Sequence, residues 1–122
     1  MKKVKVQDLW GSTLAWAMHV LRMMDDGLSR EEAEEDANTC QPGLGAFDLE
    51  ELIEIYRIGL LPPDGHRGSQ WMAFFYQRTQ YDLTMAEGIQ DAQFGGTPIN
   101  AVLRCILAHH VGKEVEVPEG LL

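Results

Sequence analysis

Residues 95–98, Gly-Gly-Thr-Pro, are the sharpest candidate for a ligand site in this chain. A threonine followed by proline is typical of a helix start, where free backbone amides and the positive dipole end can hold a phosphate or carboxylate. Pro98 removes one of those amides, and an ordinary capped turn is the commoner meaning of the same residues. The ligand-binding candidates are the turn residues Gly95, Gly96 and Thr97 and two arginines, Arg104 and Arg57.

The thiols and imidazoles are the next groups that could do chemistry. Cys105 and His109 share a helical face, but no Cys-x-x-Cys or second histidine pair completes a metal-binding set. Cys105 is therefore predicted to be a core residue, and His109-His110 to interact with the last carbonyls of their helix. Cys40 precedes Pro42 in a predicted loop beside an acidic run, where a thiolate nucleophile is disfavoured. We predict no metal, no cofactor and no enzymatic activity, because no known catalytic motif is present either.

Negative charge is concentrated in one short stretch. The formal net charge is −9, and residues 25–36 contain seven acids against the single base Arg30. Binding to phosphates needs clustered lysine and arginine, so direct contact with a nucleic acid is disfavoured. Such a run of acids is ordinarily a solvated surface. Its functional interpretation is a binding surface for a basic protein partner. The partner-binding candidates here are Glu31, Glu32, Glu34 and Glu35.

Aromatic residues cluster between positions 71 and 76. In a strand they fall on both faces, because successive side chains point to opposite sides. One face is predicted to fill the core, and the other to be covered by a helix, a ligand or, most commonly, a second subunit. Trp71 and Phe75 join the partner-binding candidates, and a homodimer is expected.

Length and composition favour one globular domain spanning residues 1–122, with 45% hydrophobic residues and an independent core. Lys5, Gln7 and Asp8 interrupt the apolar run that a signal peptide would need. His19 and Arg22 break the next apolar stretch, so we predict no membrane span and a cytoplasmic location. Both cysteines are expected to be free thiols.

The first half of the chain predicts a strand and two helices. Val4 and Val6 alternate with polar residues, which favours a short edge strand. A helix with a broad apolar stripe begins at Ser12, and Gly27 is a plausible terminator. Ser29 and Glu32 have capping-box spacing before an acidic second helix that extends to about Asn38.

The middle of the chain predicts a hairpin. Asp48 caps a short helix, a strand follows through Leu61, and residues 62–68 have strong turn chemistry. The aromatic segment 71–76 is the returning strand. Residues 77–94 have weak periodicity, and either a helix or a partly ordered excursion fits them.

The end of the chain predicts a helix starting at Pro98 and closed by Gly112, followed by a strand containing Val115 and Val117 that Pro118 ends. The predicted fold is α+β. A small, mostly antiparallel sheet combines the central hairpin with the terminal strands, and the first and last helices pack against it.

Two segments also resemble a known family. The C-terminal residues are Gly96-Thr97-Pro98-Ile99, Ala101, Arg104-Cys105, Gly112 and Glu114-Val115-Glu116-Val117-Pro118. The N-terminal residues are Val4-Lys5-Val6, Asp8-Leu9, Gly11, Leu14 and Trp16-Ala17. Both sets resemble the NinX-like proteins of tailed bacteriophages and prophages. Ile53-Glu54, Ile58 and the Trp71–Ala73 region resemble the middle of that family more faintly.

The resemblance covers about half of the chain and implies a phage or prophage accessory protein, not a reaction. The Ser/Thr-Asp-Trp segment expected before the central strand is absent, and residues 40–47 stand in its place. Residues 76–94 look like an enlargement. A family site in either segment would be lost or rebuilt here.

These observations favour binding over catalysis. The leading hypothesis is a non-enzymatic protein that binds a host or phage protein through its acidic helix and an adjoining aromatic surface. The alternative is a protein that binds or sequesters a small, nucleotide-like anion at the Gly95–Thr97 turn. An enzyme would require distant Cys, His and acidic residues to converge in the fold.

Overall fold

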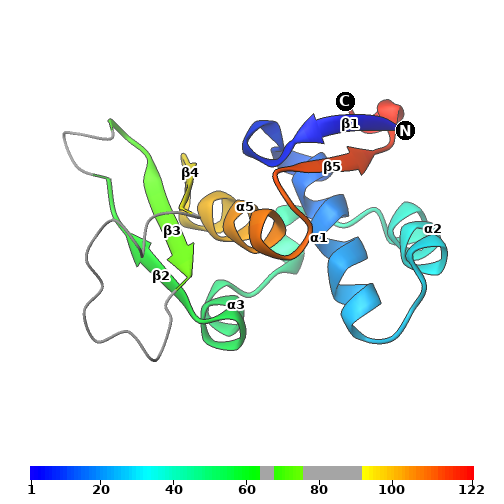
Figure 1. Ribbon diagram of the computed structural model, residues 1–122, viewed down its shortest axis with the longest axis horizontal. Helices are drawn as coiled ribbons and strands as arrows, with labels where there is room; N and C mark the ends of the chain where they lie inside the picture. The colour runs from blue at the N-terminus through cyan, green and yellow to red at the C-terminus, as the bar shows by residue number, and fades with distance from the viewer. Residues whose placement is uncertain (64–67, 76–91) are drawn as a thin grey trace.

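The computed structural model describes residues 1–63, 68–75 and 92–122. Its longest helices are α1 (Gly11–Asp25), α2 (Arg30–Cys40) and α5 (Pro98–His110). In Figure 1, a three-stranded sheet, α5, α1 and α2 succeed one another along the long axis. The α+β class is therefore confirmed.

The terminal strands form a sheet of their own. β1 (Lys2–Lys5) pairs antiparallel with β5 (Glu114–Val117), which places Val4 opposite Val115. Val115 and Val117 are buried while the glutamates between and before them are exposed, as the alternation predicts. β5 packs against α1. The terminal pair thus closes one side of the helical core.

The central hairpin belongs to a second sheet. β2 (Ile58–Leu61) pairs antiparallel with β3 (Trp71–Phe75), which pairs with β4 (Gln93–Gly95). The prediction that the hairpin and the terminal strands share one sheet is wrong, because they form two separate sheets. The reason is that β3 and β4 pack on α5, whereas β5 packs on α1, so the helices lie between the sheets.

Capping residues set the start and end of α1 and α2. Gly27 follows α1 with φ +104° and donates its amide to the Met24 carbonyl at 3.0 Å, as expected of a terminator. At the start of α2, Ser29 Oγ accepts from the Glu32 amide and Glu32 Oε1 accepts from the Ser29 amide, both at 3.2 Å. The predicted capping box is confirmed, and the hydrogen bond that the Ser29 amide donates to the carboxylate lowers the pKa of Glu32.

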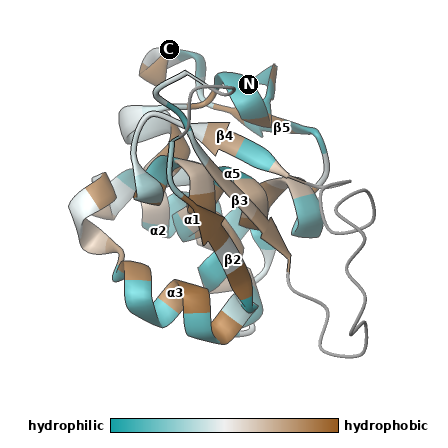
Figure 2. Ribbon diagram, turned by 90° about the vertical axis from the view of Figure 1, so that its left-hand side faces the viewer, coloured by the Kyte–Doolittle hydropathy of each residue, from teal (hydrophilic) through white to brown (hydrophobic). Residues whose placement is uncertain are grey.

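α3 (Leu49–Tyr56) is short and amphipathic. Asp48 accepts hydrogen bonds from the amides of Glu50 and Glu51, and Leu52 is fully buried. In Figure 2 the ribbon of α3 alternates between hydrophobic and hydrophilic colours. Arg57 then adopts a left-handed conformation, which separates α3 from β2. The predicted order of helix and strand is confirmed.

α5 lies at the centre of the molecule. Thr97 Oγ1 accepts from the Asn100 amide at 3.3 Å, and Pro98 occupies the first turn. Leu103, Ile106 and Leu107 are fully buried between the sheet and α1. Gly112 follows with φ +125°. No helix within the described residues is long and apolar enough to cross a membrane.

Some predictions fall outside the described residues. These are the centre of the turn at residues 64–67, the strand position 76, and residues 77–91 of the predicted helix or excursion. The end of that segment is described, and there Gln93 and Phe94 belong to β4. Gly95 is also a strand residue, although the sequence predicts a flexible turn at this position.

We expect Thr97→Ala to lower the free energy of unfolding by about 1 kcal/mol, because the first turn of α5 loses its side-chain cap. Urea denaturation followed by circular dichroism measures this change. Thr97→Ser keeps the accepting oxygen and is expected to unfold close to the wild type. Equal losses in both variants would contradict the capping role.

Candidate functional site

Gly95 has a packing role in this fold. It lies buried in β4 opposite Trp71, and a Cβ added there would meet the Ala101 backbone nitrogen at 2.6 Å and Asn100 Cβ at 2.8 Å. Only a residue without a side chain allows the first turn of α5 this close to the strand. Gly96 and Thr97 are exposed, and nothing lies within 4 Å of a Cβ added to Gly96. Of the predicted turn site, these two residues alone face solvent.

Arg104 connects three parts of the core. Its Nε and one terminal nitrogen donate to the Leu9 carbonyl at 2.9 and 2.7 Å, and the other terminal nitrogen donates to the Phe94 carbonyl at 2.7 Å. Burial lowers the pKa of Arg104, while the negative charge of Asp8 opposes that shift. The guanidinium is directed at backbone carbonyls, so the structure does not place it at the start of α5 to meet an anion. Arg57 lies at the exposed end of α3.

Trp71 and Phe75 do not adjoin the acidic helix. Both are half-buried against the core, and the centroids of the Phe75 and His109 rings lie 4.0 Å apart. His110 makes an edge contact with Tyr56 at 5.3 Å, and burial, followed by the charge of His109, lowers the pKa of His110. In Figure 1, β3 and α2 lie at opposite ends of the molecule. The prediction of one continuous surface from both is therefore wrong.

The four glutamates of α2 have different environments. Glu34 is half-buried and accepts from Arg30 at 2.9 Å, and Glu32 closes the capping box. Glu31 and Glu35 are exposed, one turn apart, and their side chains have no hydrogen-bond or ion-pair partner among the described residues. These two carboxylates are the ones available to an external cation.

A cleft that adjoins α2 is lined in part by Trp16, which is 3% exposed. Trp16 Nε1 donates to Asn38 Oδ1 at 2.9 Å beside this cleft of about 430 Å³. Trp10, with 74% of its surface exposed, lines a neighbouring hollow that shares two residues with the cleft. The cleft lies between the start of α1, the end of α2 and the C-terminal turn, and its walls are formed by Ser12, Trp16, Ala37, Asn38, Gln41, Pro42, Pro118, Gly120 and Leu121.

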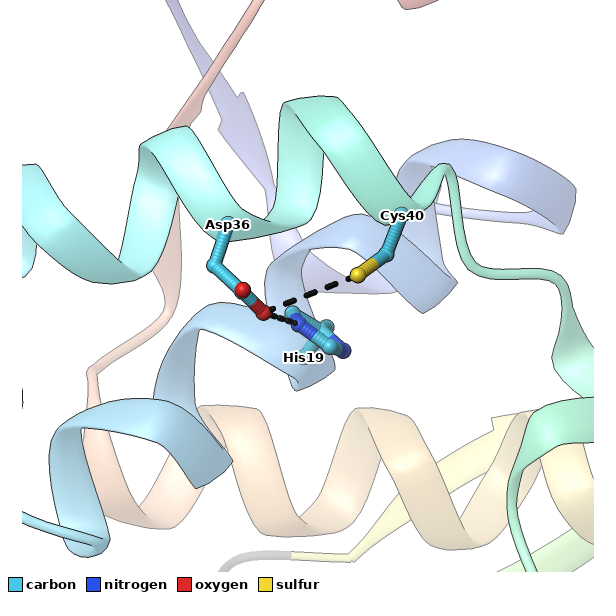
Figure 3. Close-up of side chains that lie close together, drawn as sticks. All are labelled: His19, Asp36 and Cys40. Carbon is cyan, nitrogen blue, oxygen red and sulfur yellow. Dashed lines mark hydrogen bonds and ion pairs between the residues drawn. The ribbon is translucent and has the colours of Figure 1, made fainter.

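The helix pair α1–α2 also brings together a histidine, a carboxylate and a thiol. His19 Nε2 lies 2.6 Å from Asp36 Oδ2, and Cys40 Sγ lies 3.7 Å from the same oxygen. Figure 3 shows Asp36 and Cys40 descending from α2 toward His19 on α1. Cys40, predicted to lie in a loop, is the last residue of α2.

Sequence reasoning missed this cluster because it searched for ligands close together in the chain. Asp36 and Cys40 are four residues apart on one helix, a spacing visible in the sequence. His19 belongs to another helix, and only the packing of α1 against α2 reveals it as their partner. The pair considered from the sequence, Cys105 and His109, is divided between the core and the surface.

No family model, curated protein or solved structure matches this chain. Its function is therefore inferred from the charge and geometry of the described residues. The likeness of its two ends to the NinX-like family stays a prediction.

Proposed function

We propose that this chain is a small accessory protein of a tailed bacteriophage or prophage that acts by non-catalytic binding. Its partner is a host or phage protein that presents a basic segment. The segment docks on α2 and enters the cleft beside Trp16. The observation that carries the proposal is that α2 presents Glu31 and Glu35, which have no partner among the described residues, and that its last turn lines a cleft at Asn38 and Gln41.

Charge supports a basic partner. Residues 25–36 contain seven acids and one base, and Arg30 is already paired with Glu34. The cleft also faces the last turn of α2, where the helix dipole is negative. Complementary charge of this kind mainly accelerates association and selects the partner.

The cleft supplies the apolar part of such an interface. A lysine or arginine has a long aliphatic stem that packs on apolar surface while its charged end stays at the rim. Pro42 and Leu121 provide most of that surface, since Trp16 is only 3% exposed, and the Asn38 and Gln41 side chains provide polar groups. Trp10 stands exposed next to it, and exposed tryptophans are enriched among residues that dominate binding energy.

The phage assignment has a separate support. It comes from the resemblance of both chain ends, including Gly96-Thr97-Pro98 and Trp16-Ala17, to the NinX-like family. Trp16 lines the proposed cleft, whereas Thr97 caps α5. The C-terminal resembling segment also contributes Pro118 to the cleft, so both segments reach the candidate surface.

The double variant Glu31→Gln/Glu35→Gln is expected to weaken partner binding about five- to thirtyfold, since two rim charges contribute about 0.5 to 1 kcal/mol each. The partner is first captured from host lysate with wild-type protein and identified by mass spectrometry. Calorimetry and stopped-flow association at two salt concentrations then compare the variants. Most of the loss is expected in the association rate.

The matched control is Glu50→Gln/Glu54→Gln, which removes two exposed carboxylates at the same spacing from α3. It is expected to bind nearly as the wild type does, whereas Trp10→Ala is expected to dissociate faster. An equal loss in both double variants would mean that net charge alone matters. That result, or a wild-type capture that yields no specific partner, would refute the proposed surface.

A further inference from the structure

The His19, Asp36 and Cys40 cluster has the composition of a metal site. Imidazole, carboxylate and thiolate are the three ligand types that Zn²⁺ binds in proteins. The three ligand atoms lie within 4.8 Å of one another. They come from two helices, and the buried alanines Ala33 and Ala37 let α2 pack closely on α1.

The distances fit a tetrahedral ion after a small side-chain adjustment. Neighbouring ligand atoms around tetrahedral Zn²⁺ are about 3.3 to 3.6 Å apart. The distance from Cys40 Sγ to Asp36 Oδ2 is 3.7 Å, close to that value. His19 Nε2 and Asp36 Oδ2 are 2.6 Å apart, so they would separate by roughly 0.7 Å as the ion takes the place of the hydrogen bond between them.

The same atoms fit a cysteine nucleophile less well. Such a nucleophile is typically activated by an imidazole in direct contact with its sulfur. Here Asp36 Oδ2 contacts the imidazole Nε2 and also accepts a hydrogen bond from the thiol. The carboxylate therefore lies between the imidazole and the thiol. Figure 3 shows the three side chains meeting at one point between the helices.

Access from solvent completes the site. The His19 side chain is 18% exposed, the Asp36 side chain is 42% exposed, and Cys40 is exposed. An ion can therefore enter without opening the core. Three protein ligands leave one tetrahedral position for water or for a donor atom of a bound molecule.

We propose that His19 Nε2, Asp36 Oδ2 and Cys40 Sγ form a divalent metal site of the zinc class between α1 and α2. Binding releases the thiol proton, and the His19 imidazole binds through Nε2 with its ring proton on Nδ1. The ion links the two helices across their outer edge. This inference goes beyond the proposed partner binding and stands independently of it, since Glu31 and Glu35 have no part in the cluster.

The test uses Zn²⁺ and Co²⁺ with the full chain stripped of metal by a chelator. Native mass spectrometry is expected to show one Zn²⁺ per chain. The absorption spectrum of the Co²⁺-loaded protein is expected to show a thiolate charge-transfer band. His19→Gln, Asp36→Asn and Cys40→Ser are each expected to weaken Zn²⁺ at least about tenfold in competition with a fluorescent chelator. Cys40→Ser also removes the Co²⁺ band.

Alkylation provides an independent readout because Cys40 is exposed and Cys105 is fully buried. Iodoacetamide is expected to modify Cys40 in the metal-free protein, and stoichiometric Zn²⁺ to protect it. Glu35→Gln is the matched control, since it removes one carboxylate beside Asp36 and is expected to bind Zn²⁺ normally. Circular dichroism verifies the fold of every variant.

Each result decides the proposal. Selective loss of Zn²⁺ in the three ligand variants supports the site. Unchanged Zn²⁺ affinity in those variants places the ion elsewhere and overturns it. Absence of Zn²⁺ binding, or alkylation of Cys40 at the same rate with and without Zn²⁺, overturns it equally.

Discussion

Replacing Arg104 by methionine is expected to lower the free energy of unfolding by about 3 to 5 kcal/mol. Three charge-assisted hydrogen bonds disappear, and the carbonyls of Leu9 and Phe94 lose the cation that holds them. A buried acceptor left without a partner costs about 1 to 3 kcal/mol. Phe94 retains a hydrogen bond from Gln7 at 3.1 Å, so Leu9 is expected to account for most of the loss.

Thermal and urea denaturation measure this effect. For a domain of 122 residues, 1 kcal/mol corresponds to about 4 °C in the melting temperature, so a loss near 3 kcal/mol lowers it by about 12 °C. Arg104→Lys is the matched control because it keeps the charge without the planar fork. It is expected to recover part of the lost stability.

The outcome also bears on the anion-binding alternative. If Arg104→Met had the same free energy of unfolding as the wild type, the three short hydrogen bonds of the guanidinium would not contribute to stability. Arg57→Met replaces an exposed arginine and serves as the comparison. If Arg104→Met loses much more stability than Arg57→Met, the role of Arg104 is structural.

Gly95→Ala is expected to destabilise the fold by about 2 kcal/mol. The added methyl group meets the backbone nitrogen of Ala101 at 2.6 Å, a distance that neither β4 nor α5 can relieve without moving. Overpacking of this kind costs about 1 to 3 kcal/mol, partly offset by the lower entropy of the unfolded alanine chain. Urea denaturation at constant pH measures the difference.

Gly96→Ala provides the neighbouring control. Nothing lies within 4 Å of its added Cβ, and the substitution is expected to leave stability unchanged or slightly raised. A loss in both variants would point to a shared backbone requirement of the turn. The close contact between β4 and α5 would then not be the reason for the glycine at position 95.

Local chemistry made most of the helices predictable. Ser29 and Glu32 cap α2, Thr97 and Pro98 begin α5, and Gly27 follows α1, each by contacts within a few residues of the chain. The same is true of the alternation around Val115 in β5. These features depend on short-range hydrogen bonds and on side-chain periodicity, both of which are visible in the sequence.

Long-range pairing was predictable only in part. The hairpin of β2 and β3 followed from its turn chemistry, but the third strand, β4, did not. Gln93–Gly95 is too short to show a period, and two glycines in succession favour a turn. Its place in the sheet depends on partners supplied by β3 and by Gln7, far away in the chain.

By itself, the sequence determined the α+β class, the starts of α2 and α5 and the acidic surface of α2, because these follow from local propensity and composition. Only the tertiary structure decided which side chains meet. It directed Arg104 at two carbonyls, set Trp16 beside the acidic helix in place of Trp71, and joined His19 to Asp36 and Cys40. The physical reason is that such contacts depend on how helices pack, and no spacing within one helix records its neighbour.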